Sequence, residues 1–374
     1  MPEFEKHIPT AFIIGTPFQL LCAVEAIREF EIDNYLIVAL LDGGERDNQF
    51  VQMLQGMHVN YESFKLYDLD EMLDDYLQQK GLFSVSNRSE YERIMIGDYY
   101  DLTLWEMAYC YAKPHANIVF MDDGTASILL LKGHLVTNEP TTWYERRRWR
   151  ETEFKPTMAA RKKVMNKWKE KNLCCRNGIY TLFADIPSRY FKAYPNTFSH
   201  IVSARKESQD GEYICIIGTV ADAFCPVMGV SIPQYEGLLW QKLSEIRSKS
   251  PNATIQYIPH GRDTNEATKL FCKALNIEYK RLDCSVEYYC IREKKYPTAI
   301  YGWGSTALFT LKKMSPTISA TNWYVYNPQA MGSKDLKTLT KYYVQHDIKT
   351  DVMRFPALPI RKRISRSIKY LLCR

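Results

Sequence analysis

The 374-residue sequence contains no long apolar run, and this absence excludes membrane-spanning helices. No segment approaches the roughly 18 consecutive apolar residues that such a helix needs. The first ten residues carry Glu3 and Glu5, and they lack the basic start and long apolar stretch of a secretory signal. We therefore expect a cytoplasmic protein.

Several common sequence patterns are also missing. The ten cysteines form no Cys-x-x-Cys pair, and the adjacent Cys174 and Cys175 are too close for a relaxed disulfide. No repeat of 20 to 50 residues, low-complexity segment or Walker A loop occurs. Hydrophobic residues make up 46% and charged residues 25% of the chain, so the chain has enough apolar surface to fold fully. We expect a globular protein with reduced, mostly packed thiols.

The chain is long enough for two domains, and its strand and helix patterns form two series. In the first, residues 11–14 and 35–41 are apolar strands, and Thr16 with Pro17 predicts the start of the helix between them. A buried strand at 117–121 follows later. Strands that alternate with helices predict a parallel sheet covered on both faces.

The second series repeats this alternation, with predicted strands at 213–217, 254–258 and 299–302. A polar stretch at 203–211 separates the two series and is the predicted linker. The sequence thus predicts an α/β protein with two doubly wound, Rossmann-like domains, over residues 1–205 and 206–335.

Two basic segments stand out although the net charge is only +6. Residues 143–176 contain twelve Arg and Lys against four Glu and are interleaved with aromatic residues. They predict a basic helical insertion, which is either a solvated face or a contact for an acceptor or lipid. Residues 361–374 place Ile364, Ile368 and Leu371 on one helical face, which suits either an anionic membrane surface or packing on the first domain. The small net charge does not call for a nucleic-acid partner.

In open α/β sheets, ligands bind beyond the carboxyl ends of the strands, and four junctions there carry polar residues. Asp122-Asp123-Gly124 follows a buried strand. Adjacent carboxylates repel one another, which raises one pKa and can yield a general base near neutral pH. A plain turn is the structural alternative.

The segment Pro259-His260-Gly261-Arg262-Asp263 also follows a strand. A histidine and an arginine beside a helix N-terminus suit a phosphate group, although a structural histidine is the alternative. Asp263, with Glu266 three residues later, is predicted to cap the next helix.

At the third junction, Gly302 and Gly304 precede Ser305 and Thr306, so backbone and hydroxyl donors can bind a phosphate. Helix capping alone would also explain Ser305. The remaining junction runs from Thr16 to Gln19, where Gln19 either reaches into the crevice or belongs to a well-capped helix.

Taken in chain order, from Thr16 to Thr306, the four junctions resemble bacterial sialyltransferases of glycosyltransferase family 52 and, more distantly, bacterial polysialyltransferases of family 38. The shared pattern is a Thr-Pro-Phe-Gln turn, an acidic-acidic-Gly motif, a His-Pro motif and a late pair of hydroxyl residues. The resemblance covers the sites from Thr16 to Thr306. One departure is Gly261, which stands where the family usually has proline.

The resemblance implies a GT-B fold, with two Rossmann-like domains facing a central cleft and C-terminal helices at 336–374 that return to the first domain. It implies that Asp123 is the general base, supported by Asp122. It further implies that His260 stabilises or protonates the departing CMP phosphate.

The other implied site residues form two groups. The donor-binding group is Gly218, Pro259, Arg262, Glu287, Gly304, Ser305 and Thr306, with Glu287 on the ribose hydroxyls. The acceptor-side group is Thr16, Gln19 and Gly124.

The implied reaction is inverting transfer of sialic acid from CMP-sialic acid to a glycan or glycolipid hydroxyl, without metal or other cofactor. A homodimer and peripheral attachment to the inner membrane face are further expectations. Two alternatives stay open. In the first, the enzyme uses another nucleotide sugar, such as a Kdo-like, legionaminic-type or hexose donor. In the second, the chain is a non-enzymatic protein that binds polyanions or a lipid surface.

Overall fold

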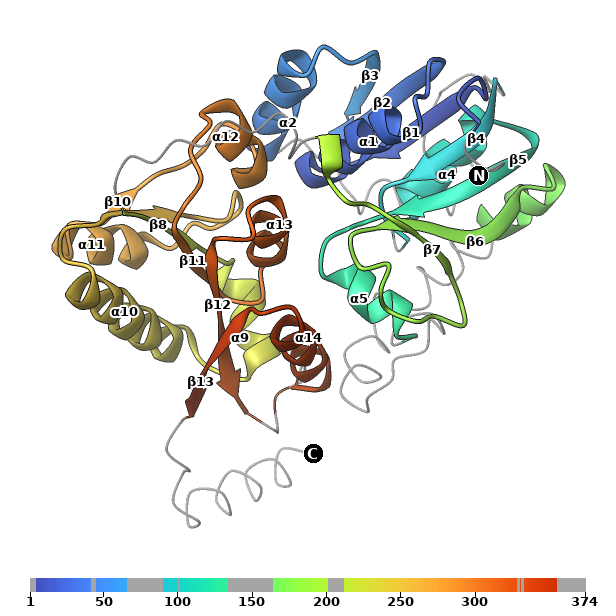
Figure 1. Cartoon of the computed structure of the whole chain (residues 1–374). Helices are drawn as coiled ribbons and strands as arrows, with labels where there is room; N and C mark the ends of the chain where they lie inside the picture. The colour runs from blue at the N-terminus through green and yellow to red at the C-terminus, as the bar shows by residue number, and fades with distance from the viewer. Residues whose placement is uncertain are drawn as a thin grey trace, which may run out of the picture.

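A computed structural model of the chain describes residues 5–41, 45–65, 90–99, 101–133, 164–200, 212–327, 330 and 333–354. These residues form two α/β lobes, each built on one parallel sheet (Figure 1). The predicted linker at 203–211, most of the basic segment 143–176 and the tail 361–374 lie outside the described residues.

The first lobe contains a seven-stranded sheet in the order β3-β2-β1-β4-β5-β6-β7, and all its strand pairs are parallel. Its strands are β1 (Thr10–Ile14), β2 (Tyr35–Leu41), β3 (Tyr61–Lys65), β4 (Tyr91–Ile96), β5 (Ala112–Met121), β6 (Cys174–Thr181) and β7 (Lys192–Pro195). Its helices are α1 (Pro17–Glu29), α2 (Glu45–Gly56), α4 (Leu102–Tyr111) and α5 (Ala126–Leu131).

The second lobe contains a six-stranded parallel sheet in the order β10-β9-β8-β11-β12-β13. Its strands are β8 (Tyr213–Ile217), β9 (Thr254–Ile258), β10 (Glu278–Tyr279), β11 (Ala299–Gly302), β12 (Ser319–Tyr326) and β13 (Lys349–Arg354). Its helices are α9 (Ala221–Met228), α10 (Ile232–Lys249), α11 (Glu266–Ala274), α12 (Val286–Arg292), α13 (Thr306–Met314) and α14 (Ser333–Gln345).

Both sheets follow the strand order of a Rossmann fold, in which ligands bind where the order reverses. In the first sheet the reversal lies between β1 and β4, and in the second it lies between β8 and β11. The central strands are long apolar runs because helices cover both faces of the sheet; all five residues of β1 and of β8 are buried. The predicted α/β architecture with two Rossmann-like lobes is confirmed.

The two lobes share a hydrophobic core along helices α13 and α14, which lie on the side of the second sheet that faces the first lobe (Figure 1). Phe309 of α13 packs on Phe183 of the first lobe, with ring centroids 4.9 Å apart. Tyr342 of α14 donates a hydrogen bond to Asp185 Oδ1 at 2.7 Å. The two lobes therefore pack directly against each other along these helices.

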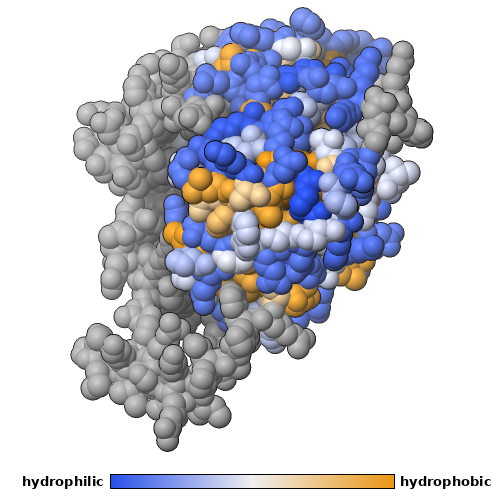
Figure 2. Space-filling view, turned by 90° about the vertical axis from the view of Figure 1, so that its left-hand side faces the viewer, coloured by the Kyte–Doolittle hydropathy of each residue, from blue (hydrophilic) through white to orange (hydrophobic). Residues whose placement is uncertain are grey.

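Helices α10 and α11 lie on the outer side of the second lobe (Figure 1). Figure 2 shows an apolar area on this side, and the exposed Trp240 and Leu270 belong to these two helices. Among the described residues, no helix is long and apolar enough to span a bilayer.

The described end of the basic segment is helical at residues 164–170, as predicted, but the helix does not continue to residue 176. Cys174–Thr181 is strand β6, which pairs with β5. Trp168 is buried and stacks on Trp105, with ring centroids 4.5 Å apart. The buried Lys171 donates to the carbonyl oxygens of Tyr109 and Ala112 at 2.7 and 2.9 Å. Because backbone acceptors satisfy this ammonium group, a locally basic sequence can pack in the interior.

The second lobe also continues past residue 335, where we expected only helices returning to the first lobe. Residues 336–354 include most of α14 and all of β13, which pairs in parallel with β12. Strand β13 lies at the sheet edge and lacks the continuous apolar run of a central strand, so its sequence did not indicate a strand. Helix α14 nevertheless contacts the first lobe, through Tyr342.

A third correction concerns the start of α11. Asn265, not Asp263, caps this helix, and its side chain accepts a hydrogen bond from Ala267 N at 2.9 Å. Asp263 is buried in the preceding turn, where its backbone N–H donates to His260 O at 2.8 Å. The turn after β9 is therefore longer than the capping pattern predicted.

Candidate active site between the two sheets

Asp122 and Asp123 follow β5 but occupy different environments. The Asp122 side chain is fully buried and accepts hydrogen bonds from Thr181 Oγ1 at 2.5 Å and from Leu182 N at 2.6 Å. Burial raises the pKa of Asp122 to about 6, while its hydrogen bonds and the nearby Lys313 ammonium act in the opposite direction. Asp123 is half-buried, so of the two carboxylates it is the one that a substrate can reach.

Gln19, in the first turn of α1, orients the Asp123 carboxylate. Its Nε2 donates to Asp123 Oδ1 at 2.8 Å, and its Oε1 accepts a hydrogen bond from Gly15 N at 2.8 Å. Gln19 is itself buried. A side chain at Gly97 would place its Cβ 2.3 Å from Gln19 Oε1, so Gly97 is a supporting residue that no local motif indicated. The amide of Gln19 thus has a single orientation, and it holds Asp123.

Thr16 stabilises the same turn at the N-terminus of α1. Its hydroxyl caps α1 by accepting a hydrogen bond from Gln19 N at 3.2 Å. The predicted start of this helix, with Pro17 in its first turn, is confirmed. Thr16 therefore positions the turn that carries Gln19.

Gly124 joins this loop to the second lobe. It has φ of +71°, and a Cβ on it would lie 2.3 Å from Thr306 Oγ1. The next residue, Thr125, donates its backbone N–H to the same oxygen at 3.0 Å. The Asp-Asp-Gly loop of the first lobe and the N-terminus of α13 in the second lobe are consequently in direct contact.

The N-terminus of α13 is the predicted phosphate site. Gly304 has φ of +60°, and its N–H donates to Asn322 Oδ1 at 2.8 Å. Ser305 caps the helix through Ala307 N at 3.3 Å. Tyr343 Oη donates to the carbonyl oxygens of Gly304 and Ser305 at 3.2 and 3.0 Å. Hydrogen bonds within the chain thus already use the N–H groups of Gly304 and Ala307, and the positive end of the helix dipole is what favours a phosphate group here.

The turn after β9 carries His260. The backbone N–H of Arg262 donates to His260 Nδ1 at 3.2 Å, which leaves Nε2 to carry the proton of the neutral imidazole. Arg281, which the sequence did not indicate, holds this turn by donating to the carbonyl oxygens of Gly261 and Asp263 at 3.1 and 2.5 Å. The Arg262 side chain is exposed.

Gly218 and Pro259 bring two loops of the second lobe together. Gly218 N donates to Ile258 O at 2.8 Å. A Cβ at Gly218 would lie 2.6 Å from Tyr257 Oη and 3.0 Å from Pro259 Cα. The close approach of the turns after β8 and β9 therefore requires glycine at 218.

Glu287 lies in the first turn of α12 and is enclosed. Its side chain is 5% exposed, and its Oε1 accepts a hydrogen bond from Thr310 Oγ1 of α13 at 2.7 Å. Burial raises its pKa. In this arrangement the carboxyl group binds a neighbouring helix, and a ribose could reach it only if α12 and α13 moved.

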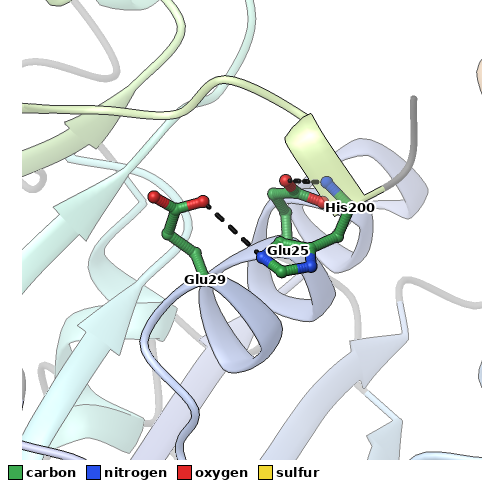
Figure 3. A group of neighbouring side chains, drawn as sticks. All are labelled: Glu25, Glu29 and His200. Atoms are coloured by element: carbon green, nitrogen blue, oxygen red, sulfur yellow. Dashed lines mark hydrogen bonds and ion pairs between the residues drawn. The ribbon is translucent and has the colours of Figure 1, made fainter. Parts of the chain in front are cut away.

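One group of possible metal ligands lies away from the crevice, within the described part of the chain. Glu25 and Glu29 of α1 and His200 bring their ligand atoms within 4.8 Å of one another (Figure 3). Glu25 Oε1 accepts a hydrogen bond from His200 N at 2.9 Å, and His200 Nε2 lies 3.8 Å from Glu29 Oε2. These contacts attach the segment after β7 to α1.

A hollow of about 420 Å³ lies between the lobes near the C-terminal end of α13. It is lined by Leu182, Ala184, Asp185, Pro195, Phe309, Lys312, Lys313 and His346. The ammonium group of Lys313 donates to Leu182 O and Asn196 O at 3.3 and 2.9 Å. The hollow thus adjoins the packed contact between the lobes and not the predicted phosphate site.

No protein-family model matches the chain, and no curated protein matches it. Its structure is similar to that of an α/β-galactoside α-2,3-sialyltransferase from the luminous marine bacterium Photobacterium phosphoreum, with a TM-score of 0.49, 12% identity, and coverage of 92% of this chain and 99% of that one. It is also similar to a sialyltransferase from Photobacterium damsela, with a TM-score of 0.44, 12% identity, and coverage of 93% and 82%.

A third similar structure is Arabidopsis thaliana UGT89C1 complexed with UDP, with a TM-score of 0.44, 10% identity, and coverage of 96% and 89%. With TM-scores below 0.5 and identities of 12% or less, these similarities assign neither a family nor an activity to the chain.

Proposed function

We propose that this protein is a glycosyltransferase that moves a sugar from a nucleotide-activated donor to a glycan or glycolipid hydroxyl, and that the donor is CMP-sialic acid. One observation carries the proposal. The loop that presents the accessible Asp123 touches the N-terminus of α13, through the 3.0 Å hydrogen bond from Thr125 N to Thr306 Oγ1. A candidate base and a candidate phosphate site therefore lie side by side where the two Rossmann-like sheets meet.

In the proposed reaction, Asp123 accepts the proton of the acceptor hydroxyl while that oxygen forms a bond to the anomeric carbon. The bond from this carbon to the phosphate oxygen breaks on the opposite face, so the configuration inverts and CMP leaves. Gln19 holds the Asp123 carboxylate during this step. Asp122 anchors the loop from the interior.

The departing phosphate gains negative charge, and stabilising this charge is the main electrostatic requirement of the reaction. The Ser305 hydroxyl and the positive end of the α13 dipole would stabilise this charge. We propose that His260, whose Nδ1 atom accepts a hydrogen bond from Arg262 N, is a further group that stabilises this phosphate. These groups would bind the phosphate without a metal ion.

The first test is CMP release from CMP-sialic acid, with and without a galactose-terminated acceptor. We expect release by the wild type, and a loss of about a hundredfold or more in Asp123→Asn and His260→Ala, the order expected for removing a general base or an oxyanion donor. His7→Ala and Asp33→Asn are matched controls, since these two exposed residues pair with each other far from the crevice. Both controls should retain wild-type turnover.

Two outcomes would redirect the proposal. Tight binding of CMP without release would keep the phosphate site but favour another CMP-activated acidic sugar, whereas binding of UDP in place of CMP would favour a hexose donor. If neither nucleotide binds, the transferase proposal is wrong and a non-enzymatic role becomes the better hypothesis. Attachment to an anionic membrane through residues 361–374, and dimerisation, remain separate proposals that liposome binding and sedimentation would test.

A further inference from the structure

We propose that Thr306 and Lys313, near opposite ends of helix α13, are positioning residues that hold the Asp122-Asp123-Gly124 loop, so that the second lobe fixes the orientation of the Asp123 carboxylate. The inference rests on the proposed function, because it concerns residues that would act through Asp123. It also changes the role of Thr306, which the sequence assigned to phosphate binding.

The first contact is at the N-terminal end of α13. Thr306 Oγ1 accepts a hydrogen bond from Thr125 N at 3.0 Å, two residues after Asp123. The same oxygen fits against Gly124 only because that residue lacks a side chain: a Cβ there would lie 2.3 Å from Oγ1 and 3.3 Å from Thr306 Cβ. The threonine hydroxyl is thus bound to the loop of the other lobe.

The second contact is at the C-terminal end of α13. Lys313 Nζ donates to Leu182 O at 3.3 Å and to Asn196 O at 2.9 Å, both in the first lobe. The N–H of Leu182 in turn donates to Asp122 Oδ2 at 2.6 Å. Lys313 therefore holds the residue whose N–H binds the buried carboxyl of the pair.

Together, the two contacts fix a rigid helix against the first lobe, at the Asp-Asp-Gly loop and at the segments after β6 and β7. Thr306 and Lys313 are seven residues apart, or about 10 Å along a helix with a rise of 1.5 Å per residue. Contacts at two well-separated points fix both the position and the direction of α13 relative to the first lobe, which carries the loop. A displacement of about 1 Å at a reacting group can lower a rate about a hundredfold. The position of the second lobe relative to the first would consequently determine whether Asp123 reaches the acceptor hydroxyl.

Electrostatics supports the same arrangement. Burial raises the pKa of Asp122, and the positive charge of Lys313 acts in the opposite direction. Burial likewise lowers the pKa of Lys313, while Asp122 and Asp185 act in the opposite direction. The buried Asp122 and the half-buried Lys313 favour each other's charged forms across the lobe boundary.

The kinetic test uses full-length Thr306→Val, which keeps the shape but removes the hydroxyl, and Thr306→Ser, which keeps the hydroxyl. Lys313→Met has a matched control in Lys312→Met, because Lys312 Nζ donates within its own lobe, to Pro316 O and Ile318 O at 3.0 Å each. We expect kcat for CMP release to fall about tenfold to a hundredfold in Thr306→Val and Lys313→Met. The affinity for CMP should not change, and Thr306→Ser and Lys312→Met should resemble the wild type.

A second measurement does not depend on turnover. Hydrogen exchange at the backbone N–H of Thr125 and of Leu182 should become faster in Thr306→Val and Lys313→Met respectively, and should stay unchanged in Lys312→Met. If the wild type releases no CMP, the proposed function fails while this exchange measurement still tests the contacts. The positioning role is overturned if exchange is the same in all variants, or if CMP affinity falls in step with kcat in Thr306→Val, since that would mean direct contact with the phosphate.

Discussion

The buried carboxyl of Asp122 should make the stability of the protein depend on pH in a way that one substitution can isolate. Burial raises the pKa of this group from its usual 3.8 to about 6 in the folded chain. Between these two values the folded protein keeps the proton while the unfolded chain releases it. The stabilisation is therefore fully present below about pH 4 and is lost as the pH rises through about 6. A separation of roughly 2 pKa units corresponds to roughly 3 kcal/mol.

Asp122→Asn removes the titration and keeps the shape of the side chain. The variant should be less stable than the wild type throughout, since its amide cannot replace both acceptor oxygens for Thr181 and Leu182. The informative quantity is the change in the free energy of unfolding with pH. The free energy of unfolding in urea should fall by roughly 3 kcal/mol more in the wild type than in the variant between about pH 4 and pH 7.

An exposed carboxylate provides the control. Asp33→Asn should leave the wild-type pH dependence in place, because Asp33 lies at the surface beside His7. Parallel curves for the wild type and Asp122→Asn would show that the folded and unfolded pKa values of Asp122 coincide. The assignment of Asp122 as a buried anchor with a raised pKa would then be wrong.

Three further predictions concern the loop, the core and metal dependence. Gln19→Leu removes the donor to Asp123 and the acceptor for Gly15 N, so kcat for CMP release should fall about tenfold to a hundredfold in a folded protein; unchanged kcat would contradict the role of Gln19. Trp168→Ala removes a buried ring stacked on Trp105, so the free energy of unfolding in urea should fall by about 3–5 kcal/mol. A change near zero would mean that this ring is exposed to solvent. EDTA should leave CMP release unchanged, and recovery of lost activity by added magnesium would refute metal independence.

The fully buried elements could be predicted from the sequence because their signals are local. Strands β1 and β8 are continuous apolar runs, since each is covered on both faces. Thr16 and Pro17 marked the start of α1, because capping depends only on neighbouring backbone groups. Two doubly wound sheets follow from the alternation of such elements.

Other elements could not be predicted, because their stability comes from distant partners. Strand β13 at the edge of the sheet has a mixed sequence and is defined by its pairing with β12. Strand β6 begins inside the basic segment, and the partners of Trp168 and Lys171 in this segment, Trp105 and two backbone carbonyl oxygens, are remote in sequence. The cap of α11 moved from Asp263 to Asn265, since both residue types favour that position locally.

For the site, the sequence by itself determined which residue types follow the central strands: paired carboxylates after β5, a histidine after β9, and glycines with hydroxyls after β11. Only the tertiary structure decided how these residues divide their roles. Asp122 points inward because Thr181 and Leu182 supply its hydrogen bonds, and Asp123 stays accessible beside Gln19. Thr306 meets Gly124, and Glu287 is enclosed by α13. These outcomes depend on contacts between residues more than 20 positions apart, which local sequence patterns do not encode.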